Sequence, residues 1–459
     1  MKKSIRKNLS VLVAVSMLHP LISSSASGQV TVKDAVQMAL NTNPEVNARF
    51  HAFRDVYEAQ GVANGKYWPR VDATAGIGRQ WLSGDNISTT NYLRKGVRLE
   101  LSQMIFDGYS TRNEVKQLKY SGQARYFEFL DSMESVGLES FRTYSDVLRY
   151  REMVRIAKRN LDYHMEIARQ VSSRVKAGLS TGVDLEQINA RIALAQSNYL
   201  TEQSNLHDVN ARYLRLTGGR PANELSAVVI PSAGIPDNVS DALNEAYRHS
   251  PGFLATIDDV NAARYEKRVK KAAFSPRLDL KAYRDWSVDA DGISGLQNNS
   301  VVEMRVTWNI LNGGSDTASV RQYTERMFRA EDIKNKSAND LRQILSIAVN
   351  DRHTLKEQVK LLDEHRQKLD HVRIAYREQF GIAKRTLLDL LDTENEYYQS
   401  QRAYTNGYYD LVIANARVLA GMGKLLVTLG VSRDVMPDTS DIDIPAPVVT
   451  DRDLPAERL

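Results

Sequence analysis

Apolar and polar residues alternate with a period of two in four segments of the chain. In the second half the apolar positions are Leu278, Leu280, Ala282, Trp286, Val288, Val302, Met304, Val306, Trp308 and Ile310. In the first half they are Val71, Ala73, Ala75, Ile77, Val97, Leu99 and Leu101. This period is typical of half-buried β-strands. It predicts one long hairpin at about 70–106 and a second at about 277–311.

Apolar residues at alternating spacings of three and four mark the segments that follow each hairpin. One series is Leu341, Leu345, Ala348, Leu355, Val359, Leu362 and Leu369. Another is Leu185, Ile188, Ile192, Ala195, Tyr199, Leu206, Val209, Tyr213 and Leu216. No proline interrupts residues 109–177, and a continuous helix of that length would reach roughly 100 Å. These heptads predict long helices packed side by side in a coiled-coil rod.

The same plan occurs twice along the chain. Pro44 matches Pro251 at an offset of 207, and Asp184 matches Asp389 at an offset of 205. In each half a helical stretch, at about 32–65 or about 240–273, precedes the hairpin, the very long helix and a returning helix. Since several further pairs match at the same two offsets, we interpret the chain as a tandem duplication.

The repeats and the composition of the ends divide the chain into five segments. Basic residues precede an apolar run from Leu9 to Ile22 and then a stretch of small residues, which is the order of a secretory signal peptide. The predicted segments are a signal peptide at 1–27, a first repeat at 28–217, a linker at 218–239, a second repeat at 240–430 and a polar tail at 431–459.

Charge and cysteine content narrow the classes of function. The chain has 61 Lys and Arg against 56 Asp and Glu, and four of the basic residues belong to the predicted signal peptide. The remainder is nearly neutral and has no basic patch with interleaved aromatic residues, so we expect no nucleic-acid partner. Cysteine is absent, which excludes thiolate chemistry. Beyond the signal peptide no apolar run reaches the ~18 residues of a membrane-spanning helix, so the strands are the candidate membrane segments.

Enzymatic signatures are missing. The histidines are scattered, and neither a His-Glu-x-x-His motif nor a Gly-x-Ser-x-Gly elbow occurs. We therefore predict a protein that is not an enzyme and binds no cofactor or metal. An exported hydrolase on a helical stalk is the disfavoured alternative.

Four strands are too few to close a membrane barrel, because single-chain barrels begin at 8 strands. Two chains would supply 8 strands and three would supply 12, and the larger number suits an open pore. The predicted fold is mainly α with membrane β: a long coiled-coil α-helical barrel plus a 12-stranded β-barrel shared by three protomers, with an internal tandem repeat. The alternative is an ordinary soluble sheet that caps a coiled-coil rod.

Two segments between the long helices and their returns carry a family resemblance. They are Gly178-Leu179-Ser180-Thr181-Gly182-Val183-Asp184-Leu185 and Arg385-Thr386-Leu387-Leu388-Asp389-Leu390-Leu391-Asp392. With these motifs, about residues 30–430 resemble the TolC family of trimeric outer-membrane channels. The resemblance implies a barrel in the outer membrane and a helical tunnel that extends into the periplasm. It also implies that an adaptor docks at the tips, where the residues are Gly178, Leu179, Ser180, Thr181, Ala383 and Lys384.

The candidate gate lies in the same two segments. Ser180 or Thr181, followed by Asp184, suits the start of the returning helix, because their oxygens can accept from free backbone N–H groups. Asp389 and Asp392 are three residues apart, and threefold symmetry would make them two rings of carboxylates that attract cations. The resemblance implies that Arg385 and Asp184 form links that hold the tip shut, and that Asp389 and Asp392 line the constriction. Phe380 stands where some members have tyrosine, so a tyrosine-dependent hydrogen bond is missing there.

The expected function is that of an outer-membrane channel subunit in a tripartite export system. The expected partners are two further copies of the chain, a periplasmic adaptor, an inner-membrane ABC or proton-driven transporter, and outer-membrane lipid. The cargo is type I secreted proteins, drugs and other small molecules, or both, and the second tip motif favours secretion or a shared role. A dedicated multidrug efflux channel is one alternative, and a non-channel coiled-coil protein of the envelope is the other.

Overall fold

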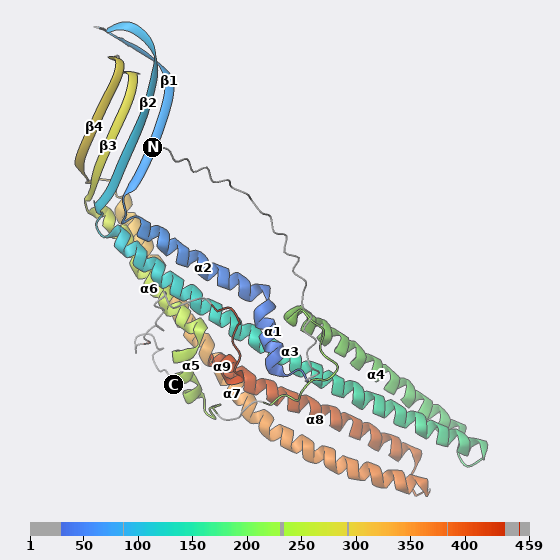
Figure 1. Ribbon diagram of the computed structural model, residues 1–459. Coiled ribbons are helices and arrows are strands. Elements are labelled where there is room, and N and C mark those ends of the chain that lie inside the picture. Colours follow the sequence, from blue (N-terminus) through green and yellow to red (C-terminus); the bar gives the residue numbers. More distant parts are fainter. Residues whose placement is uncertain are drawn as a thin grey trace, which may run out of the picture.

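The computed structural model describes residues 29–85, 87–229, 234–291, 293–382, 384–436 and 449. A curved β-sheet lies at one end of an elongated bundle of helices (Figure 1). The predicted signal peptide at 1–27 lies outside the described residues, as does most of the predicted tail. Among the described residues, none of the helices combines the length and the apolar character needed to cross a bilayer.

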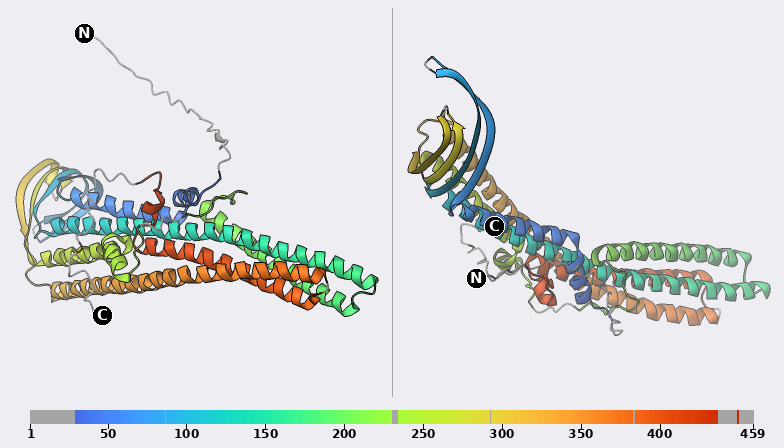
Figure 2. Two further views of the ribbon diagram at one scale, coloured as in Figure 1. Left: turned by 90° about the horizontal axis from the view of Figure 1, so that it is seen from below. Right: turned by 45° about the horizontal axis from the view of Figure 1, so that its top comes forward.

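Two helices of 67 residues each form the length of the bundle. They are α3 (Ser110–Lys176) and α7 (Ser315–Gly381), and each is followed by a returning helix, α4 (Gly182–Thr217) or α8 (Leu387–Gly421). The four helices run side by side toward the end opposite the sheet (Figure 2). The predicted helical rod is therefore confirmed, because its heptad positions bury one helix against the next.

The helical stretch predicted before each hairpin consists of two helices in each half. In the first half α1 (Val32–Thr42) and α2 (Pro44–Gly65) meet at Asn43. In the second half α5 (Val239–His249) and α6 (Pro251–Lys271) meet at Ser250. A proline disfavours helical geometry in the residue before it but fits the first turn of a new helix. The proline at N1 therefore produces a corner in each half.

All four predicted strands are present and form one antiparallel sheet in the order β1-β2-β3-β4. Their bounds are β1 (Arg70–Gly84), β2 (Ile87–Phe106), β3 (Arg277–Ala290) and β4 (Ile293–Thr307). The second hairpin is shorter than predicted, because β4 ends at Thr307. The next residue, Trp308, donates its indole N–H to the backbone oxygen of Phe274, which follows α6, at 3.2 Å. Trp308 therefore contacts the backbone beside the helices and does not continue the hydrogen-bonded ladder between β3 and β4.

The two faces of the sheet differ in character. Because side chains alternate along a strand and share a face with their register partners, one face collects apolar residues, here called the apolar face. Its members include Val71, Ala73, Ala75, Ile77, Val97, Leu99, Leu101, Leu280, Ala282, Trp286, Val288, Val302, Met304 and Val306. The other face carries ion pairs, including Arg98–Asp285 at 2.8 Å and Lys281–Glu100 at 3.9 Å.

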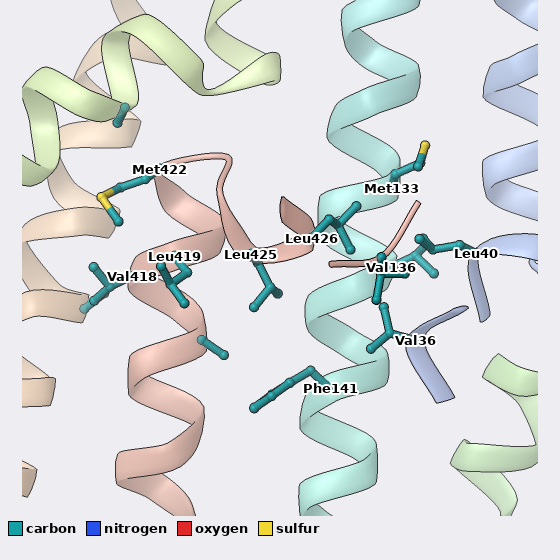
Figure 3. Close-up of a cluster of buried hydrophobic side chains, with 14 of the residues drawn as sticks. Val36, Leu40, Met133, Val136, Phe141, Val418, Leu419, Met422, Leu425 and Leu426 are labelled. Carbon is teal, nitrogen blue, oxygen red and sulfur yellow. The ribbon is translucent and has the colours of Figure 1, made fainter. Parts of the chain in front are cut away.

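The main hydrophobic core lies in the middle of the molecule, where the short helices surround α3, α7 and α8. Leu425 and Leu426 of α9 (Leu425–Leu429) lie in this core with Val136 of α3 and Val36 of α1 (Figure 3). A Cβ at Gly137 would lie 2.6 Å from the Leu426 side chain, so α9 approaches α3 closely at a residue without a side chain. The core therefore joins α9, at the end of the second half, to α1 and α3 of the first half.

Candidate functional site at the helical tips

The two turns that carry the family motifs lie together at the end of the bundle farthest from the sheet (Figures 1 and 2). Residues 177–181 connect α3 to α4, and residues 382–386 connect α7 to α8. In the first turn Gly178 has a φ of 71°, a conformation that glycine adopts without strain. The next residue, Leu179, is 78% exposed. Leu179, one of the residues predicted to dock an adaptor, is therefore accessible.

The first turn begins its returning helix with a capping box. Thr181 is the N-cap, and its side chain accepts from the backbone N–H of Asp184 at 3.3 Å. The Asp184 carboxylate accepts from the Thr181 backbone N–H at 2.9 Å and from the Ser180 hydroxyl at 2.8 Å. These hydrogen bonds, the backbone one first, lower the pKa of Asp184. Asp184 has the capping role that its sequence position indicated.

The second turn repeats this arrangement with Thr386 and Asp389. The Asp389 carboxylate accepts from the Thr386 hydroxyl at 2.9 Å and from the Thr386 backbone N–H at 3.2 Å. These bonds, the hydroxyl first, lower the pKa of Asp389. Sequence analysis treated Asp389 only as a gate residue. The signal for its capping role was present, because Thr-x-x-Asp occurs in both repeats at the same offset.

Asp392 has a different partner from Asp389, although both lie in the first turns of α8. One oxygen of Asp392 is 2.6 Å from the Arg191 guanidinium, which belongs to α4. This ion pair joins the returning helices of the two halves. Arg191 was missed by sequence analysis, because no local motif distinguishes it from the other charged residues of a coiled-coil helix.

Arg385 is held within its own turn. Its guanidinium donates to the Gln379 side chain at 3.0 Å and lies 4.2 Å from the centre of the Tyr376 ring. Among the described residues no ion pair joins Arg385 to Asp184, so a single chain does not bring these two predicted partners together. Lys384 is exposed, and Ala383 lies outside the described residues.

Phe380 is buried at the tip, with 6% of its surface exposed. It packs in a small core formed by all four long helices, whose other members are Tyr163, Ile167, Val171, Ile188, Leu387, Leu390 and Leu391. The Arg174 guanidinium lies 4.5 Å from the Phe380 ring centre, within the range of a cation–π contact. Phe380 therefore joins the two turns through apolar packing.

Glu394 is a second buried feature that sequence analysis missed. It is 5% exposed and lies 3.8 Å from the Arg373 guanidinium. Burial raises its pKa to about 7, because the charged carboxylate loses its hydration, and Arg373 only partly offsets this cost. The described residues contain no cluster of His, Asp or Glu that could hold a metal ion.

Comparison with known proteins places this arrangement in a family. The outer membrane efflux protein family matches residues 35–219 and 242–424. The chain is 24% identical to the outer membrane efflux protein BepC of Brucella suis over 422 residues, which is 90% of either chain. It is 22% identical to the alkaline protease secretion protein AprF of Pseudomonas aeruginosa, over 93% of this chain and 88% of AprF.

The fold is also that of solved channels. The Campylobacter jejuni CmeC outer membrane channel superimposes with a TM-score of 0.78 at 16% identity, over 93% of this chain and 94% of CmeC. The family match covers most of the chain in two parts and confirms the resemblance that the tip motifs indicated. The chain belongs to the outer membrane efflux protein family, and it is an outer-membrane export channel protein and not an enzyme.

Proposed function

We propose that three copies of this chain close a 12-stranded barrel in the outer membrane above a shared helical tunnel. The observation that carries the proposal is the sheet itself, whose outer strands β1 and β4 have no neighbour on one side in the part of the chain that the structure describes. Unpaired strand edges are unfavourable in a bilayer, because every backbone N–H and C=O there must be paired. The apolar face would meet lipid and the ion-paired face the lumen.

The two matched parts of the chain support the proposed division into repeats. The family matches lie inside or next to the segments 28–217 and 240–430, and both segments contain the same order of elements. In this proposal residues 218–239 link the repeats on the outside of the bundle. Residues 1–27 form the signal peptide, and 431–459 form the polar tail.

We propose that the tips form the gate and the docking site of the channel. Threefold symmetry would bring three copies of Asp389 and Asp392 around one axis, where six carboxylates would attract cations. Asp184 and Arg385 would meet across protomers, since the Arg385 guanidinium donates to the neutral Gln379 side chain and has no ion pair among the described residues. A periplasmic adaptor would dock on the exposed first turn at Gly178–Thr181 and on Ala383 and Lys384 of the second.

The proposed cargo includes both small molecules and secreted proteins. AprF is named for alkaline protease secretion and BepC for efflux, and this chain is 22% identical to AprF and 24% identical to BepC. The partners would be an adaptor together with an inner-membrane ABC or proton-driven transporter. Restoring export in a strain that lacks its own channel would separate the two roles, with secreted protease and drug tolerance measured in the same cells.

Single-channel conductance of the purified protein in a planar bilayer, with its mass in detergent, tests the proposed pore. A trimer that gives stable, cation-preferring pores is the expected result. A folded monomer, or a trimer that stays in the soluble fraction of a membrane preparation, would contradict the shared barrel.

A further inference from the structure

Three basic residues interrupt the apolar face of the sheet. Arg79 of β1, Lys95 of β2 and Arg284 of β3 share this face with the apolar residues, as their register partners show: Lys95 is opposite Ile77 and Val288, and Arg284 is opposite Leu99. Every other charged side chain described in the strands has the opposite parity and lies on the ion-paired face. These three cations, here called the basic cluster, therefore need a separate explanation.

The basic cluster has no counter-charge within the described chain. Arg79 donates to Asn91, a neutral side chain, at 2.7 Å, and Arg284 lies 5.1 Å from the centre of the Trp286 ring. No ion pair is found for Lys95 among the described residues, and its side chain is exposed. By contrast, Arg94, the neighbour of Lys95 on the opposite face, is 3.8 Å from Asp291. Lys95 and Arg94 thus differ in their partners as well as in the face that they occupy.

Two of the three cations lie beside the same tryptophan. Arg79 is the diagonal neighbour of Lys95, since Ile77 is the residue directly opposite, but its guanidinium donates to Asn91 and therefore extends toward the hairpin turns, away from Lys95. The backbone of Arg284 lies nearer the helices than that of Lys95, since Arg284 is opposite Leu99. Its guanidinium extends over Trp286, toward the hairpin turns. The hairpin turns form the end of the sheet farthest from the helices (Figure 1). Lys95 and Arg284 are therefore both next to Trp286, while the Arg79 guanidinium lies nearer the turns.

An apolar groove lies beside Lys95. It has a volume of about 490 Å³ and is lined by Ala75, Ile77, Val97, Trp286, Val288 and Leu296, with Lys95 as its one charged member. The groove crosses all four strands of the sheet and therefore does not depend on the contact between protomers. An elongated apolar chain fits its lining, and an anionic group at one end of that chain would meet Lys95.

We propose that Lys95, Arg284 and this groove bind one anionic lipid, with an acyl chain in the groove and the phosphate between the two cations. The proposal rests on the proposed placement of the apolar face against the lipid of the outer membrane. Long basic side chains in a bilayer extend toward the interface, and a phosphate accepts well from guanidinium and ammonium groups. A zwitterionic lipid fills the groove equally well but leaves the net charge of the cluster uncompensated.

Fluorescence quenching by brominated lipids tests this site, because Trp286 lies in the groove. The other three tryptophans (Trp68, Trp81 and Trp308) would be replaced by phenylalanine, and the trimer would be reconstituted into phosphatidylcholine vesicles. Brominated phosphatidylglycerol as a minor component is expected to quench Trp286 well beyond its share of the lipid. Each removed cation, in Lys95→Gln or Arg284→Gln, should weaken this preference by roughly fivefold.

Arg94→Gln is the matched control, since it removes a cation one residue from Lys95 but on the opposite face, and it should leave the preference unchanged. High salt should weaken the preference in the parent protein, because the attraction is partly electrostatic. Quenching by brominated phosphatidylcholine without any preference for the anionic lipid would overturn the lipid site while supporting membrane insertion. No quenching by either lipid would overturn the placement of the apolar face in the bilayer, and the lipid site with it.

Discussion

The two turns at the tip start their returning helices with the same capping box but surround it with different charges. In the first turn Asp184 bonds only to Ser180 and Thr181. The second turn adds Arg385, Asp392 and the buried Glu394, whose counterparts at the offset of 205 are Ser180, Gln187 and Asn189. The residues common to both turns thus start the helices, and Arg385 and Asp392 give the second turn charged side chains that the first turn lacks at the same positions.

The largest effect that we expect from this difference is a pH dependence of stability specific to the second tip. The folded-state pKa of Glu394 is raised to about 7 from a normal value of 4.5, so the folded protein holds a proton that the unfolded chain releases. Stability should fall as pH rises from about 4.5 to about 7 and then level off. Glu394→Gln should remove this component, which amounts to at most about 3 kcal/mol.

Free energies of unfolding of the parent and of Glu394→Gln at pH 5 and pH 8 would measure this component. At pH 8 the free energy of unfolding of the variant should exceed that of the parent, and at pH 5 this difference should be much smaller. Glu396→Gln, an exposed change on the same helix, is the control. An equal difference at both pH values would contradict the raised pKa.

The next effect concerns the carboxylates of the second tip. Asp389→Ala combined with Asp392→Ala should weaken the block of conductance by multivalent cations from the periplasmic side by about tenfold, or about 1.4 kcal/mol, because the proposed rings lose their charge. Asp184→Ala with Gln187→Ala makes the equivalent change at the first tip and should have a smaller effect. Unchanged block in the first double variant would remove Asp389 and Asp392 from the gate.

Loss of either cap should have a similar and moderate effect. Thr181→Ala and Thr386→Ala each remove the side chain that accepts from the third helical N–H, at a cost of about 1 kcal/mol. Hydrogen exchange of the backbone amides in the first turn of α4 or α8 would measure the local loss of stability. Thr181→Ser and Thr386→Ser keep the accepting hydroxyl and should retain the protection of the parent. A much larger loss at one tip would show that its threonine does more than cap the helix.

The smallest effect on stability should come from the ion pair between the two tips. Arg191 and Asp392 are partly exposed, with 27% and 53% of their side chains accessible, so Arg191→Gln should cost less than about 1 kcal/mol. It should nevertheless strengthen cation block, because Asp392 loses its positive neighbour. Arg215→Gln, which breaks a similarly exposed pair with Glu139 far from the tip, should leave block unchanged. Weaker block in Arg191→Gln would contradict the proposed charge arrangement.

Much of the architecture follows from local patterns. Period-two alternation predicted all four strands, and heptads predicted helices that the structure places at Gly182–Thr217 and Ser315–Gly381. These predictions succeed because alternation and heptads are the periods of the backbone itself. The second hairpin was predicted too long, because a contact to the backbone beyond α6 draws Trp308 away from the strand. The prolines that divide each preceding helical stretch into two helices were not used in the prediction.

At the tips, the sequence was sufficient to identify the two turns, the cap at Asp184 and the family, because each depends on residues a few positions apart. Only the tertiary structure paired Asp392 with Arg191, buried Phe380 between α3, α4 and α8, and raised the pKa of Glu394. These features depend on which side chains of separate helices come within a few ångströms and on how much water remains beside them. A repeat of seven residues defines the seam between two helices, but it does not specify which charged residue of another helix lies across from it.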